Sequence, residues 1–171
     1  MTVYRARMDG FVFWLTFSFL ALFGVIVAAM LRSVAARTES TLLNVALAAA
    51  TMFIVGIAVY AYAYAPKAFH LSDGVLRIER LASDVTIPLA SVTDVRPLDV
   101  FLGLTLKAPP GGNSGLFGIY GTFYRTELGK FRMYSRTATQ TVLLVTSNGH
   151  VVVGPDRRDE FIASVRAEKG A

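Results

Sequence analysis

Two uncharged stretches decide the fold of this chain: FVFWLTFSFLALFGVIVAAML at residues 11–31 and LLNVALAAATMFIVGIAVYAYAYA at residues 42–65. As α-helices they would measure about 31 and 36 Å, against a bilayer hydrocarbon core of about 30 Å. The apolar core of a cleavable signal peptide is shorter, at about 7 to 15 residues. Two buried helices of a soluble protein would need a much larger chain around them. The pattern therefore predicts two retained transmembrane helices.

The connection between the two stretches is short, which fixes how the helices run. Residues 32–41 are too few to cross the bilayer again, so the helices form an antiparallel hairpin with both ends on one side. Basic residues near that side outnumber Arg32 and Arg37 of the loop; they are Arg5, Arg7, Lys67, Arg77 and Arg80. The positive-inside rule then places residues 1–10 and everything after residue 65 in the cytoplasm, and the loop outside it.

Each predicted span carries features typical of membrane helices. Aromatic residues that suit the cytoplasmic interface are Phe11, Phe13 and Trp14 on the first span and Tyr60, Tyr62 and Tyr64 on the second. Small residues recur four positions apart; they are Gly24, Ala28, Ala46, Ala50, Ala61 and Ala65. Such spacing lets helix backbones approach closely, either within the hairpin or against another subunit. Neither span holds an ionisable residue, which argues against a transport path.

Residues 66–171 are predicted to form one mostly β domain that ends in a helix. Short apolar or alternating runs occupy residues 67–71, 75–80, 85–89, 92–95, 101–107, 119–124, 130–135, 141–146 and 151–153. Ser72-Asp73-Gly74 and Asn148-Gly149 are hairpin turn signals. From Asp156, a good N-cap, the period changes to that of an amphipathic helix over about residues 156–168. The order predicts a small barrel or sandwich with a helix over one open end.

Several segments of this domain resemble the bacterial pleckstrin-homology-like (PH-like) domains. They are GLFGIYGTF at residues 115–123, LGKFRMY at 128–134, Asn148-Gly149, and Gly154-Pro155-Asp156 leading to Glu160-Phe161-Ile162. The resemblance implies a PH-like barrel of about seven antiparallel strands capped by a C-terminal α-helix, here following a membrane α-helical hairpin. It also implies a non-catalytic interaction module, and a bilayer that is the bacterial inner membrane.

The strongest candidate site is a basic cluster in the second half of the domain. Together with Lys67, the candidate contacts to anionic lipid or a partner are Arg125, Lys130, Arg132 and Arg136. The alternative is a solvated sheet face, because alternation places Lys130 and Arg132 opposite Phe131 and Met133. Phosphoinositide-binding relatives carry basic residues around the first strand loop, whereas Ser72-Asp73-Gly74 holds an acid there.

Other chemistries find little support in the sequence. The absence of Cys excludes disulfides and thiolate chemistry, and His70 and His150 have no partner at a metal-ligand spacing. Ser114 lacks the context of a nucleophilic serine, and Gly115, Gly118 and Gly121 match neither a phosphate loop nor a dinucleotide fingerprint. We therefore expect no catalytic residue, no cofactor and no metal.

The charge balance bears on the partner. Lys and Arg number 17 against 12 Asp and Glu, and the high apolar content favours a bilayer over nucleic acid as the anionic partner. The sequence thus predicts a membrane-anchored scaffold or accessory subunit of a larger integral-membrane complex. The alternatives are a module that binds lipid headgroups through its basic strands and, with the least support, an enzyme that acts on lipid.

Overall fold

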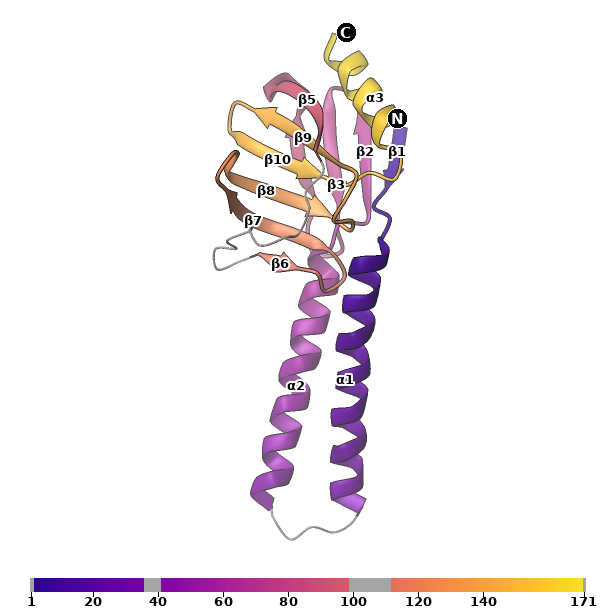
Figure 1. Cartoon of the computed structure of the whole chain (residues 1–171), viewed down its shortest axis with the longest axis vertical. Helices are drawn as coiled ribbons and strands as arrows, with labels where there is room; N and C mark the ends of the chain where they lie inside the picture. Colours follow the sequence, from indigo (N-terminus) through magenta and orange to yellow (C-terminus); the bar gives the residue numbers. More distant parts are fainter. Residues whose placement is uncertain (1, 36–40, 99–111, 171) are drawn as a thin grey trace.

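Two long helices project from a β domain in the computed structural model, which describes residues 2–35, 41–98 and 112–170 (Figure 1). Helices α1 (Gly10–Ala35) and α2 (Thr41–Tyr64) run antiparallel, side by side. At 26 and 24 residues they measure about 39 and 36 Å. Both are long and apolar enough to cross a bilayer. The β domain sits on the ends of the helices at which α1 begins and α2 ends (Figure 1).

The first sheet has the strand order β1-β2-β3-β4 and is antiparallel throughout. Its strands are β1 (Thr2–Arg5), β2 (Ala68–Ser72), β3 (Val75–Glu79) and β4 (Val85–Pro88). Asp73 and Gly74 join β2 to β3 with φ of 53° and 71°, as a two-residue type I′ turn requires, and this confirms the predicted hairpin. Strand β1 was not predicted, because only Tyr4 of its four residues is buried and no alternation marks it.

The second sheet has the order β5-β9-β10-β8-β7-β6. Its strands are β5 (Val92–Leu98), β6 (Asn113–Ser114), β7 (Ile119–Arg125), β8 (Gly129–Ser135), β9 (Thr141–Thr146) and β10 (Gly149–Val153), and the short helix η1 (Leu89–Ser91) links β4 to β5. Strands β8 and β10 pair in parallel, so the prediction of an all-antiparallel barrel was wrong in this detail. The loop after β8 carries the chain past the place of β10, and the β9–β10 hairpin then returns beside β8. The predicted strand at residues 101–107 lies outside the described residues.

The two sheets are packed like an open sandwich, with helix α3 (Arg158–Gly170) over one end. One buried cluster fills the space between the sheets and reaches α3 through Phe161 and Val165. A second cluster lies on the other face of the second sheet, where Val12 of α1 packs against Phe123 and Phe131. The first turn of α1 is thus part of the core of the β domain.

Helix α3 begins two residues later than predicted. The Asp156 carboxylate accepts a 3.1 Å hydrogen bond from the backbone amide of Arg5, and the Asp156 amide donates to the Arg5 carbonyl at 2.9 Å. Asp156 therefore fastens the segment before α3 to strand β1. It lies two residues before the helix, whereas the sequence predicted it to be the helix N-cap.

Candidate functional site

The N-terminus of α1 is tied to the β domain through Asp9. One carboxylate oxygen of Asp9 accepts a 2.9 Å hydrogen bond from the Val12 amide, which is the third residue of the helix, as an N-cap does. The other oxygen accepts from the Thr137 hydroxyl at 3.0 Å and from the Ala138 amide at 2.5 Å. A single side chain therefore caps the helix and holds the β8–β9 loop.

The C-terminus of α2 is completed by the β domain. The last four carbonyls of an α-helix lack partners within the helix. The Tyr120 hydroxyl donates to the Ala61 carbonyl at 2.7 Å, and the Ala82 amide donates to the Ala63 carbonyl at 3.0 Å. Tyr120 is only 5% exposed, so this hydrogen bond is formed away from water.

A third contact grips α1 one and a half turns from its start. The Thr16 hydroxyl, buried at this point, donates to the Gly115 carbonyl at 3.3 Å and accepts from the Phe117 amide at 3.0 Å. Gly115 has a φ of 137°, and a β-carbon there would lie 2.1 Å from Leu15 Cδ2. The glycine-rich segment, which matches no nucleotide motif, thus allows the backbone at Gly115 to pack closely against helix α1. We call these contacts at Asp9, Thr16 and Tyr120 the helix joint.

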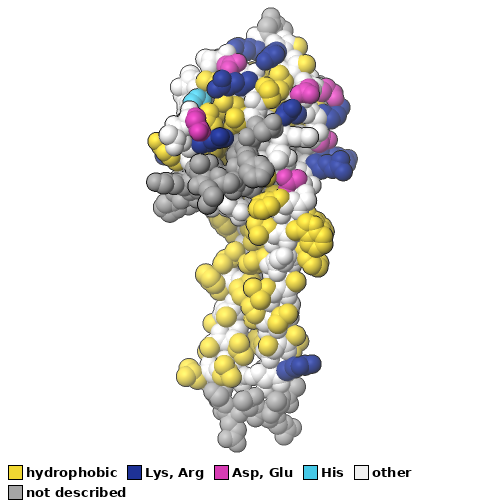
Figure 2. Space-filling view, in the orientation of Figure 1, with side chains coloured by type: hydrophobic (Ala, Val, Ile, Leu, Met, Phe, Trp, Pro, Cys, Tyr) yellow, Lys and Arg dark blue, Asp and Glu magenta, His cyan; other side chains and the backbone are white. Residues whose placement is uncertain are grey.

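Aromatic residues predicted for the interface lie around the helix joint. Figure 2 shows hydrophobic side chains over the described parts of the helices, with most charged groups confined to the β domain. Residues Phe11, Phe13, Trp14, Tyr60 and Tyr62 are exposed, and Tyr64 packs partly against the core. The Tyr62 ring lies edge to face on Phe117 at 5.5 Å, so one of these aromatics also contacts the domain.

The small residues predicted for helix packing separate into two groups. Ala61 and Ala65 are buried beside the β domain. Gly24, Ala28, Ala46 and Ala50 are exposed. A β-carbon on Gly24 would meet nothing within 4 Å. The hairpin itself is linked by other residues, since Ser33 donates to the Asn44 side chain at 3.0 Å.

The predicted basic cluster is dispersed over the domain. Lys67 lies over the Tyr62 ring at 5.6 Å, next to the helix joint. The half-buried Arg136 guanidinium donates to the Phe117 carbonyl at 3.0 Å, and burial lowers its pKa. Arg125 pairs with Glu127 at 2.5 Å in the β7–β8 hairpin. Only Lys130 and Arg132 remain together.

Lys130 and Arg132 lie on the wall of a cleft of about 470 Å³ between the two sheets. Both are exposed, as the sequence predicted, but their face is the one that also bears the buried residues Tyr134 and Val151 and looks toward the first sheet. The sequence had assigned Lys130 and Arg132 to the outer face of the sheet; the opposite face packs Phe131 and Met133 in the second core cluster. We call this space the inter-sheet cleft; its other lining residues include Val85, Ile87, Thr122 and Thr146.

Two further titratable groups of the domain, Tyr120 and Asp84, have shifted pKa values. Burial raises the pKa of Tyr120 to about 12, since a phenolate would lose water at the helix joint. The pKa of Asp84 is lowered, because its carboxylate accepts from the Arg80 amide at 3.1 Å and from the Arg77 guanidinium at 2.6 Å. Asp84 thereby forms an ion pair with Arg77, which does not line the inter-sheet cleft.

The two histidines of the described residues each lie beside one polar partner. His70 Nε2 lies 2.8 Å from a Glu79 oxygen, and His150 Nδ1 lies 2.8 Å from the Leu128 carbonyl, so each histidine has a single structural partner. Across residues 2–35, 41–98 and 112–170, no three His, Asp or Glu side chains gather as a metal site would require.

A β domain of two packed sheets closed by a C-terminal helix defines a PH-like protein, here carried on two apolar helices. The family model described as Bacterial PH domain matches residues 67–168, and the chain belongs to that family. The match starts at the first residues of β2, so β1 and both long helices lie outside it. No curated protein and no solved structure matches the chain.

Proposed function

We propose that this protein is a membrane-anchored, non-catalytic PH-like module that serves as a scaffold or accessory subunit of a larger integral-membrane complex. The helix joint carries this proposal. Hydrogen bonds at Asp9, Thr16 and Tyr120 fix the β domain directly on the helix ends, without a linker. A module fixed in this way presents each of its faces at a set height and direction above the bilayer.

The helices themselves support a membrane location. In the apolar windows of α1 and α2, only 11% and 0% of the residues are buried. Leu42 is 80% exposed and Met52 is 76% exposed, although soluble proteins seldom expose contiguous apolar surface on this scale. Hydrocarbon, or the helices of other subunits, is the environment in which such a surface is stable.

The proposed orientation of the protein in the membrane follows from the distribution of its basic residues. Arg5, Lys67 and Arg80 belong to the end of the hairpin that carries the domain, and Arg32 to the far end. The positive-inside rule then puts the domain on the cytoplasmic face of the bacterial inner membrane. The exposed small residues Gly24 and Ala28 would allow a neighbouring helix to approach α1 closely.

The test is native purification of the intact chain. Membranes that hold a chromosomally tagged copy are first washed with alkaline carbonate and then dissolved in a mild detergent. We expect the chain to stay in the membrane pellet and to co-purify with membrane subunits at a fixed ratio in two different detergents. Release by carbonate would contradict the anchor, and a chain that elutes alone in both detergents would contradict the scaffold.

A further inference from the structure

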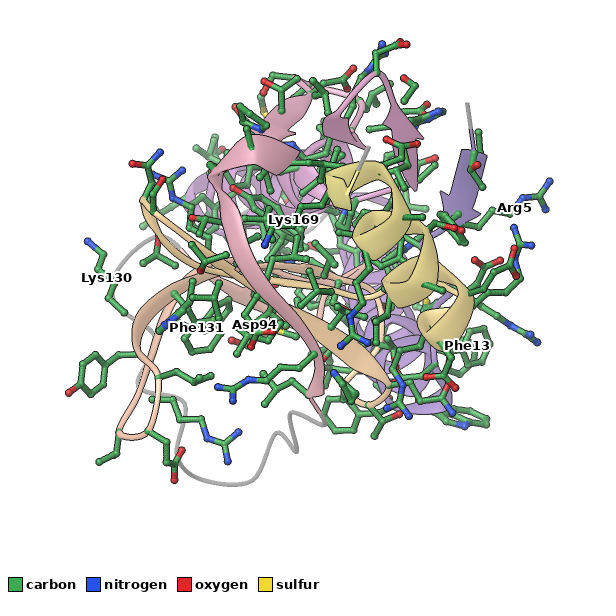
Figure 3. The ribbon with its side chains drawn as sticks, turned by 90° about the horizontal axis from the view of Figure 1, so that it is seen from above. Arg5, Phe13, Asp94, Lys130, Phe131 and Lys169 are labelled. Carbon is green, nitrogen blue, oxygen red and sulfur yellow. The ribbon has the colours of Figure 1, made fainter. Side chains whose placement is uncertain are left out.

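The inter-sheet cleft contains positive charge that the described residues do not neutralise. Among the described residues, no hydrogen bond or ion pair engages the side chain of Lys130 or Arg132. Of the described residues that line the cleft, none is Asp or Glu. Figure 3, seen from above, shows Lys130 extending away from the ribbon on the side opposite Arg5. A ligand for this cleft therefore carries negative charge.

The opposite wall of the cleft is an edge strand. Within the part of the chain that the structure describes, strand β4 pairs with β3 alone. The Leu89 amide donates to the Gly74 carbonyl, and hydrogen-bonded and open pairs alternate along an antiparallel ladder. Thr86, three residues earlier on β4, is then an open position, with its backbone groups directed away from β3. Thr86 lines the cleft, so a peptide backbone placed there finds one donor and one acceptor.

Two features limit what such a peptide can do. Pro88 has no amide hydrogen, and its carbonyl already accepts from the Ser91 hydroxyl at 2.7 Å. Main-chain pairing is therefore confined to the region of Thr86, and side chains must supply most of the binding. Val85 and Ile87 give the same wall an apolar surface.

The spacing of the two basic residues suits an extended acidic segment. Lys130 and Arg132 are two positions apart on one strand face, which separates their β-carbons by about 7 Å. Two carboxylates separated by one residue in an extended peptide have the same repeat. Thr122, opposite Arg132 on β7, and Thr146 on β9 add hydroxyl groups on this face.

The position of the cleft favours a protein segment over the bilayer surface. The turn after strand β6 contacts Thr16 of α1, and Figure 1 shows β6 and β7 lying between the helices and β8. Strand β8 is two strands away from β6, which corresponds to about 10 Å. Lys67 and Arg136, by contrast, lie at the helix joint.

We propose that the inter-sheet cleft binds an extended acidic segment of a partner protein, with carboxylates on Lys130 and Arg132 and backbone contacts at Thr86. The inference rests on the proposed function, because it names the surface through which a scaffold would hold a subunit or client. Arg125 provides a matched control, since it belongs to the same β7–β8 hairpin but is paired with Glu127.

The experiment uses the full chain in nanodiscs of phosphatidylcholine at low ionic strength. The probe is the fluorescein-labelled peptide acetyl-Thr-Glu-Thr-Glu-Thr-amide, and its control is the same peptide with Gln in place of Glu. We expect fluorescence anisotropy to show binding of the acidic peptide and about tenfold weaker binding of the Gln peptide. The double variant Lys130→Ala/Arg132→Ala should also bind about tenfold more weakly, and Arg125→Ala should bind as the unmodified chain does. Circular dichroism checks that each variant is folded, and Arg132→Glu gives a second variant with a greater loss.

Several results would overturn the inference: no binding, equal binding of both peptides, or binding that the double variant retains. NMR shifts of the Lys130 and Arg132 amides on replacing phosphatidylcholine by phosphatidylglycerol, without peptide, would also overturn it and assign the cleft to the bilayer. The proposed function fails separately. A chain that purifies alone yet binds the peptide contradicts only the complex, and a chain in a stable complex that ignores the peptide contradicts only the cleft.

Discussion

The phenol of Tyr120, near the start of strand β7, donates a 2.7 Å hydrogen bond to the carbonyl of Ala61 in the last turn of helix α2. This bond satisfies a carbonyl that the helix cannot satisfy itself. The β domain and the helical hairpin consequently share one network of polar contacts.

Replacing Tyr120 by Phe should destabilise the protein by about 1 kcal/mol, because the Ala61 carbonyl loses its donor in a buried place. Thermal unfolding of the detergent-solubilised chain measures the change. Tyr124→Phe is the control, since Tyr124 lies on the same strand and is 48% exposed. Equal unfolding temperatures for the two variants would contradict the role given to Tyr120.

The same residue predicts a dependence on alkaline pH. The pKa of Tyr120 in the folded chain is about 12, above its ordinary value of 10. The stabilisation by the neutral phenol is thus complete below pH 10 and is lost as the pH rises through 12. The advantage in unfolding free energy of the unmodified chain over Tyr120→Phe should shrink across that window. Chemical denaturation at several pH values measures it, and a constant difference would contradict the assignment.

Asp9 allows its two tasks to be separated. Asp9→Ala removes the cap on α1 and the acceptor for the β8–β9 loop, and should cost about 2 kcal/mol. Asp9→Asn keeps one oxygen for the Val12 amide, but its amide nitrogen cannot accept from Ala138. We expect Asp9→Asn to lose about half as much unfolding free energy as Asp9→Ala does, with faster hydrogen exchange confined to the loop at Ala138. Similar losses for both variants would show that the cap on α1 contributes nothing to the unfolding free energy.

Gly115→Ala should loosen the contact of the glycine segment with α1. The new β-carbon would collide with Leu15 and would sit at a φ of 137°, where L-residues are strained by about 1 to 3 kcal/mol. Gly10→Ala is the matched control, because Gly10 is the first residue of α1 and a β-carbon there would meet nothing within 4 Å. Denaturant midpoints of both variants test the difference. A Gly115→Ala variant as stable as Gly10→Ala would contradict the prediction and would mean that the backbone shifts to accept the β-carbon.

The sequence predicted the helices and most strands because each has a periodicity of its own. The hairpins at Gly74 and Gly149 followed from turn chemistry, and α3 from the apolar face of Phe161 and Val165. Strand β1 is short, and its only buried residue is Tyr4, so no local pattern marks it. Pairing of β8 with β10 is likewise a long-range choice that alternation cannot reveal.

The candidate site was predicted by residue type but not by placement. Alternation correctly put Lys130 and Arg132 on one face, opposite Phe131. It could not tell which face meets the first sheet, because a second apolar cluster covers the other side. The helix joint was missed altogether, since Asp9, Thr16 and Tyr120 each contact residues far away in the sequence and carry no motif.

Strand β1 is synthesised before either long helix, and its partner β2 only after both. In a bilayer, the two strands lie on opposite sides if only one of the helices crosses, so a chain with a single inserted helix cannot pair them. Completion of the first sheet is thus coupled to the insertion of both helices: a chain with one helix left out of the bilayer would lack the edge strand β1. A shortened chain that begins at residue 66 would lack the same strand.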